Sequence, residues 1–89
     1  MAAMRYIRTE RFRKAAARLP VEIQAKARKA FMLFKDNPRH PSLHVQRVQG
    51  MPDVWEGRLD IHYRFTFHYE GGACVFRNIG LHPIVECEP

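Results

Sequence analysis

The stretch "HYRFTFHY" (62–69) decides the fold, because aromatic and polar side chains alternate along it without exception. Its odd-numbered positions are all Tyr or Phe, and its even-numbered positions are His62, Arg64, Thr66 and His68. A strict period of two is typical of a strand that buries one face. We therefore predict a strand whose aromatic face meets the core and whose other face carries imidazole and guanidinium groups.

Neighbouring segments predict three more strands in the C-terminal half. They are "VQRVQ" (45–49), "VWEGRLD" (54–60) and "ACVFRNIG" (73–80). The glycine- and proline-containing segments "GMPD" (50–53) and "EGG" (70–72) predict the turns between strands. Consecutive strands that are joined by short turns must be antiparallel. Residues 81–89 receive no assignment and are taken as a tail.

The N-terminal half predicts a strand at "MRYIR" (4–8) followed by a helical hairpin. Thr9 is placed to cap a helix over residues 10–19, in which apolar residues recur at helical spacing. Pro20 starts a second helix over residues 21–37, and Pro38 ends it ahead of a loop at 38–44. The expected fold is a two-layer α+β domain in the order β-α-α-β-β-β-β, with the helices on the aromatic face of an antiparallel sheet and the His/Arg face uncovered.

The bulk composition restricts the class of partner. The chain has 89 residues, enough for one domain over 1–89, with a net charge of +6 and a pI near 9.9. This charge indicates a polyanionic partner: nucleic acid, an anionic membrane surface or an acidic protein. No segment reaches the roughly 20 apolar residues of a membrane span, so we expect a cytoplasmic protein. Cys74 and Cys87 are too few and too far apart for a disulfide framework, and we expect both to be reduced.

The polar strand face offers groups that suit RNA cleavage without a metal. His62, Arg64 and His68 share that face, and Arg58 and Glu56 share one face of the preceding strand. In such cleavage one group deprotonates the 2′-hydroxyl, another protonates the leaving 5′-oxygen, and cations stabilise the phosphoryl charge. The alternative is an ordinary solvated basic surface. His40 and His44 have a metal-ligand spacing, but Pro38 and Pro41 argue against a helix there, so no metal site and no cofactor is expected.

Several segments together resemble the RelE/ParE superfamily of bacterial type II toxin–antitoxin toxins. They are the helical hairpin, the "NPRHP" loop (37–41), the "GMPD" turn, Trp55, Arg58 and the "YR" pair at 63–64, and the Gly-x-His of residues 80–82. The resemblance covers nearly the whole chain. It implies the same α+β fold, an acidic antitoxin as partner in a hetero-oligomer, and, for RelE-like members, an mRNA interferase that cleaves mRNA in the ribosomal A site.

The resemblance also implies roles for individual residues. His82 matches the histidine that members with Gly-x-His use as acid or base, and Arg64 matches a phosphate-contacting arginine. Arg58 matches a basic residue on the strand after the turn, and His62 matches the histidine of an Asp-x-His pair. We therefore expect a catalytic group of His82, Arg64, Arg58 and His62, with further RNA contacts from Arg77, Arg47 and His68.

The sequence also departs from the family pattern. Glu56 stands where well-known nucleases of the family carry a lysine, and a carboxylate there would repel phosphate unless it acts as a base. Leu81 and Pro83 flank His82 where relatives often have a hydroxyl and an acidic residue. Two alternatives stay open: a ParE-like, non-catalytic inhibitor of DNA gyrase, and an inactive basic module that binds nucleic acid.

Overall fold

The computed structural model describes residues 4–89 and confirms the expected order of helices and strands. In chain order the elements are β1 (Arg5–Arg8), α1 (Glu10–Ala17), α2 (Val21–Asp36), the 3₁₀-helix η1 (Pro41–Leu43), β2 (Gln46–Val48), β3 (Met51–Arg58), β4 (Tyr63–Glu70), β5 (Ala73–Leu81) and α3 (Ile84–Cys87). Within these described residues, no helix has both the length and the apolar character needed to cross a membrane.

The five strands form one sheet in the order β1-β5-β4-β3-β2. The pairs β2–β3, β3–β4 and β4–β5 are antiparallel, as their short connections require. However, β1 lies parallel to β5, so the sheet is mixed and not wholly antiparallel as expected. The reason is that β1 runs directly into the helical hairpin, so no tight turn dictates its direction.

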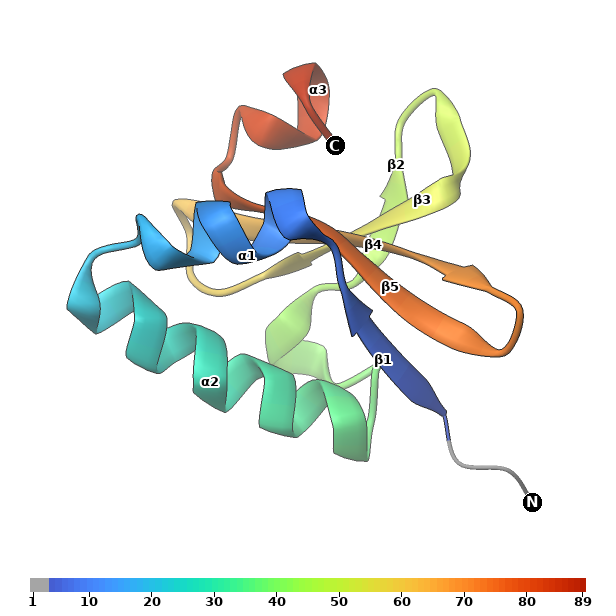
Figure 1. Cartoon of the computed structure of the whole chain (residues 1–89), viewed down its shortest axis with the longest axis horizontal. Helices are drawn as coiled ribbons and strands as arrows, with labels where there is room; N and C mark the ends of the chain where they lie inside the picture. The colour runs from blue at the N-terminus through green and yellow to red at the C-terminus, as the bar shows by residue number, and fades with distance from the viewer. Residues whose placement is uncertain (1–3) are drawn as a thin grey trace.

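The aromatic face of β4 meets the helices, as its alternation predicted. Phe65 and Phe67 are almost fully buried, and the ring of Phe34 on α2 lies 4.9 Å from that of Phe67 in an edge-to-face arrangement. Phe12 of α1 and Phe76 of β5 complete this core. Figure 1 shows α2 along one face of the sheet, while α3 lies on the opposite side.

The helix boundaries follow from local sequence. The Thr9 hydroxyl accepts a hydrogen bond from the backbone N–H of Phe12 at 3.0 Å, which confirms the predicted N-cap of α1. Helix α2 ends at Asp36, and Asn37 is extended ahead of Pro38, as the steric restriction before proline requires.

Gly57 lets β3 and β4 curve over the core. A Cβ at this position would lie 2.4 Å from the tip of the Phe65 ring, which is its cross-strand neighbour. The Phe65 ring therefore lies where any other side chain at residue 57 would be.

The prediction of a turn over residues 50–53 is wrong, because the turn is shorter and begins one residue earlier. The turn comprises Gln49 and Gly50, with Gly50 at φ 82°, and β3 already begins at Met51. Pro52 therefore lies inside a strand. The β2–β3 register shifts between Arg47 and Val48, so Pro52 falls where the ladder is interrupted and its missing N–H leaves no partner unsatisfied.

The polar face of the sheet is not uncovered, because the tail folds over part of it. Residues 84–87 form α3, and Val85 packs with Val48 and Val54 in a second small apolar cluster. The sequence prediction missed this because a single helical turn carries too little periodicity to be recognised. The tail therefore forms one wall of the site described next.

Candidate active site

Two arginines face each other across β3 and β4. Arg58 and Arg64 are directly paired in the antiparallel register, so their side chains leave the same face of the sheet. Within residues 4–89, no ion pair to a carboxylate involves either arginine. Like charges that lie directly opposite each other destabilise a sheet. An anion bound to both guanidinium groups would remove that repulsion.

Arg64 is the buried member of this pair, with 5% of its surface exposed. Its Nη1 donates hydrogen bonds to the carbonyl oxygens of Asp60, at 2.6 Å, and Tyr63, at 3.1 Å. Burial lowers the pKa of Arg64, the charge of Arg58 lowers it further, and Glu56 and Asp60 oppose the shift. Its Nε is buried without a hydrogen-bond partner. The guanidinium is thus held rigidly, and its charge is only partly compensated.

His62 and His82 lie at the same end of the sheet as the two arginines. Arg64 pairs with Gly80, and two residues further along the backbone N–H of His82 donates to the carbonyl oxygen of His62 at 2.7 Å. Both histidines are exposed. Because Gly80 has no side chain, Ile84 can pack close above it, and the chain turns sharply at His82.

Asp60 holds the loop that carries His62. Its Oδ1 accepts hydrogen bonds from the backbone N–H groups of His62 and Tyr63, both at 2.8 Å, and its Oδ2 accepts one from Lys26 at 3.0 Å. Burial raises the pKa of Asp60, but the hydrogen bonds from Lys26, His62 and Tyr63 outweigh it and bring the pKa to about 2. Asp60 is therefore ionised at neutral pH and fixes the position of His62.

A β-bulge brings Arg77 onto the same face. The β4–β5 register shifts between Thr66 and Phe67, so that Thr66 pairs with Asn78 while Phe67 pairs with Phe76, leaving Arg77 as the extra residue. Arg77 Nη1 lies 2.9 Å from His68 Nδ1. Sequence alternation could not assign a face to Arg77, because a bulge interrupts the period of two.

Arg77 and His68 are set apart from the arginine pair. Asn78 donates to the carbonyl oxygen of Glu88 at 2.8 Å, and Arg77 approaches that of Pro89 at 3.5 Å. Arg11 of α1 also donates to Pro89, at 3.0 Å. These residues therefore hold the tail beside the site. Neither Asn78 nor Arg11 was singled out in the sequence, since only the folded tail gives them a partner.

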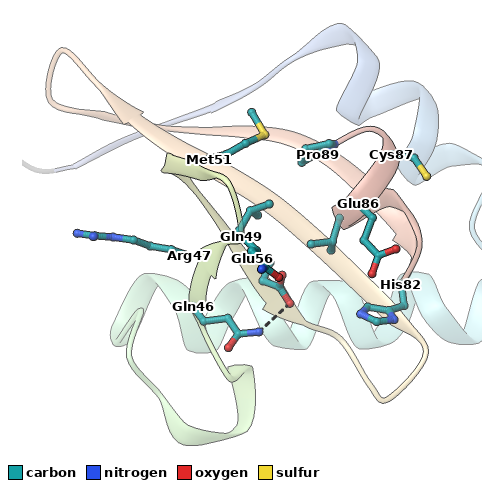
Figure 2. Close-up of a pocket in the computed structure, with 11 residues that line it drawn as sticks. Gln46, Arg47, Gln49, Met51, Glu56, His82, Glu86, Cys87 and Pro89 are labelled. Carbon is teal, nitrogen blue, oxygen red and sulfur yellow. Dashed lines mark hydrogen bonds between the residues drawn. The ribbon is translucent and has the colours of Figure 1, made fainter.

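A cavity of about 730 Å³ opens between the β2–β3 hairpin and α3. Figure 2 shows Gln46 and Glu56 on one side of it and His82 and Glu86 on the other. Glu56 is 6% exposed, and its Oε1 accepts a hydrogen bond from Gln46 Nε2 at 3.2 Å. Gln46 was not identified from the sequence, because only the β2–β3 register places it opposite Glu56.

Arg47, the third predicted RNA contact, also lies apart from the Arg58–Arg64 pair. It pairs with Trp55, and its guanidinium lies over the Trp55 ring, 5.0 Å from the ring centroid. Figure 2 shows its side chain pointing away from the cavity. Among residues 4–89, no three His, Cys, Asp or Glu side chains are grouped so that they could hold a metal ion.

The mixed five-stranded sheet, with the helical hairpin packed on one face, is the fold of RelE-like toxins. No protein-family model matches the sequence, and no curated protein is significantly similar to it.

Solved structures show which particular toxins the chain is similar to in fold. The YoeB/ParE toxin from Agrobacterium tumefaciens has a TM-score of 0.72 at 16% identity, over 89% of this chain and 99% of that one. YafQ from Escherichia coli has a TM-score of 0.76 at 10% identity, covering 92% and 97%. A RelB–RelE antitoxin–toxin complex from Methanococcus jannaschii gives 0.73 at 15% identity, covering 93% and 99%.

Proposed function

We propose that this chain is the toxin of a type II toxin–antitoxin pair and cleaves mRNA on the ribosome, without a metal, through attack of the RNA 2′-hydroxyl. The observation that carries the proposal is the Arg58–Arg64 pair, which forms no ion pair with a carboxylate of residues 4–89 and lies beside two exposed histidines. A phosphodiester supplies the anion that this pair lacks, and it places the reacting bonds next to two imidazoles, which can act as acid or base.

The reaction requires two proton transfers. One histidine accepts the proton of the 2′-hydroxyl as its oxygen attacks the adjacent phosphorus, and the bond from phosphorus to the 5′-oxygen breaks. The other histidine donates a proton to the departing 5′-oxygen, which leaves a 2′,3′-cyclic phosphate and a 5′-hydroxyl. His62 and His82 supply the two imidazoles, and either one can act as the base while the other acts as the acid.

The arginines stabilise the charge that develops on the phosphoryl oxygens. Arg58 is more accessible than Arg64 and can contact the phosphate directly, whereas the buried Arg64 contributes a fixed positive charge behind it. A guanidinium that is already held by two carbonyls does not need to reorganise during the reaction. Asp60 acts as a positioning residue through its hydrogen bond to the backbone of His62.

An acidic antitoxin is the expected protein partner. The chain carries a net charge of +6, and the Arg58–Arg64 pair together with Arg77 makes its candidate site basic. A segment rich in Asp and Glu would be attracted to this surface and would compete with RNA for it. Three of the similar solved structures are toxin–antitoxin complexes, two of RelE with RelB and one of YafQ with DinJ.

Growth arrest on expression in bacteria tests the proposal. We expect wild type to arrest growth and degrade mRNA, and His82→Ala and Arg58→Ala to lose both effects at equal protein levels. The matched controls are His44→Asn and Arg28→Ala, which change exposed residues outside the site. Full toxicity of His82→Ala and Arg58→Ala would overturn the mechanism. Arrest with intact mRNA and a DNA-damage response would instead indicate gyrase inhibition.

A further inference from the structure

The cavity beside the candidate site contains a carboxylate, that of Glu56, which phosphate binding does not explain. Glu56 lies on the same face of β3 as Arg58, two residues away. It faces the cavity, although a carboxylate so near the arginine pair weakens binding of phosphate. At about 3.3 Å per strand residue, the two positions are roughly 7 Å apart along the strand. A nucleotide whose phosphate contacts Arg58 therefore has its sugar and base within reach of Glu56.

Two carboxylates, Glu56 and Glu86, line the cavity together with the amide side chains of Gln46 and Gln49 and the imidazole of His82. Glu56 accepts from Gln46 Nε2 through Oε1, and this is the one side-chain hydrogen bond that its carboxylate makes within residues 4–89. Because Gln46 uses its amide N–H on Glu56, its carbonyl oxygen is left as an acceptor. Glu86 of α3 adds a second carboxylate from the facing side (Figure 2). Met51 and Val85 provide apolar walls against which a planar ring can pack.

A carboxylate in such a pocket discriminates among the four bases by the donors that they present. Guanine presents N1–H and the N2 amino group side by side on its Watson–Crick edge, and a carboxylate can accept from both. Adenine and cytosine each offer one amino group next to an acceptor nitrogen, and uracil offers a single N–H. Bases of single-stranded RNA are read on these edges, and a bidentate contact discriminates strongly against the other bases.

We propose that the Glu56–Gln46 pocket is a base-recognition subsite that selects guanine in the nucleotide whose phosphate is held at Arg58. This inference rests on the proposed function for the nature of the ligand, since it assigns the base of the same RNA. It also gives Glu56 a role that needs no proton transfer. The carboxylate reads the base, while the arginines hold the backbone.

Equilibrium binding of RNA that cannot be cleaved tests the subsite separately from catalysis. The probes are four fluorescent 2′-O-methyl trinucleotides, U-N-U, which differ only in the central base. We expect the G probe to bind wild type about tenfold or more tightly than the other three. Glu56→Gln should bind all four within about twofold, because the amide replaces one acceptor by a donor. The control Glu22→Gln removes the same charge from the exposed start of α2 and should keep the preference.

The outcomes separate the two proposals. Equal binding of the four probes by wild type, or an unchanged guanine preference in Glu56→Gln, would overturn the base-recognition subsite even if the protein cleaves mRNA. A guanine preference that Glu56→Gln abolishes would support it, even if wild type failed to cleave and the proposed catalytic function fell. In wild type that cleaves, mapped cut sites should be enriched in guanine at one fixed position.

Discussion

At the scale of single residues, the ionised carboxylate of Asp60 holds the backbone of the loop that carries His62. One carboxylate receives two backbone N–H groups of the His62 loop and the ammonium of Lys26. This explains why an Asp-x-His pair can matter without the aspartate touching substrate. The sequence indicated the pair, but only the folded loop shows that Asp60 acts on the backbone of His62 and not on its imidazole.

The depressed pKa of Asp60 predicts a pH-dependent contribution to stability. The folded pKa is about 2, below the ordinary 3.8, so the contribution is fully present above about pH 4 and is lost as pH falls towards 2. We expect Asp60→Asn to lower the free energy of unfolding by about 1–2 kcal/mol at pH 7, since Lys26 is half exposed and its attraction is screened. Urea denaturation between pH 2.5 and 7 measures this.

The comparison with Asp53→Asn, an exposed change on β3, controls for the loss of one charge. The difference between wild type and Asp60→Asn should shrink steadily below pH 4. A difference that stayed constant down to pH 2.5 would show that the ionised carboxylate is not what stabilises the loop.

The two cysteines should differ in reactivity. Both are free, as expected from their number and spacing, but Cys74 is fully buried in the core and Cys87 is exposed on α3. Burial raises the pKa of the Cys74 thiol to about 12, so almost no thiolate is present at neutral pH. A thiol-reactive dye should label Cys87 rapidly in the native protein and Cys74 only on unfolding. Equal labelling rates, or no reaction in denaturant, would contradict this assignment.

At the scale of elements, the predictable parts were those with a long, uninterrupted period. The alternation of 62–69 placed Phe65 and Phe67 in the core, and Thr9 and Pro38 located helix ends. The parts that were missed lie where pairing is irregular. They are the bulge at Arg77, the interrupted ladder at Pro52 and the single turn of α3, each of which depends on contacts between segments far apart in the chain.

Gly57 tests how closely β3 and β4 are packed. Since a Cβ there would overlap the Phe65 ring, Gly57→Ala should destabilise the protein by about 1–3 kcal/mol through overpacking. Chemical denaturation measures the change, and Asp53→Ala on the same strand provides a control that touches no core residue. Unchanged stability of Gly57→Ala would mean that Phe65 does not pack over residue 57.

At the scale of the whole molecule, charge and fold together support the proposal of an RNA-directed function. The net charge of +6 indicated a polyanion, and the sheet gathers Arg58, Arg64 and Arg77 on one face. The composition could not show that Arg47 instead stacks on Trp55, outside this group, because its position depends on the β2–β3 register. The sequence thus indicated residues that the fold brings together, Arg58 and Arg64, and its prediction of their role stays a prediction.

Because the proposed site binds the RNA backbone through arginines, the affinity for RNA should fall as the salt concentration rises. For a single-stranded RNA, each phosphate contact contributes about −0.7 to the slope of log K against log salt concentration. We expect Arg58→Ala to reduce the magnitude of that slope by about 0.7, whereas Arg28→Ala, on the exposed surface of α2, should leave it nearly unchanged. Equal slopes for wild type and Arg58→Ala would place the RNA backbone elsewhere on the molecule.

The most direct measurement is mRNA cleavage in a reconstituted translation reaction, with and without ribosomes, for wild type and His82→Ala. The account predicts cuts by wild type that depend on ribosomes, carry a 2′,3′-cyclic phosphate and disappear in His82→Ala, whose exposed position leaves the fold intact. Intact mRNA in every reaction, or cuts that persist in His82→Ala, would contradict the assignment of this sheet face as an active site.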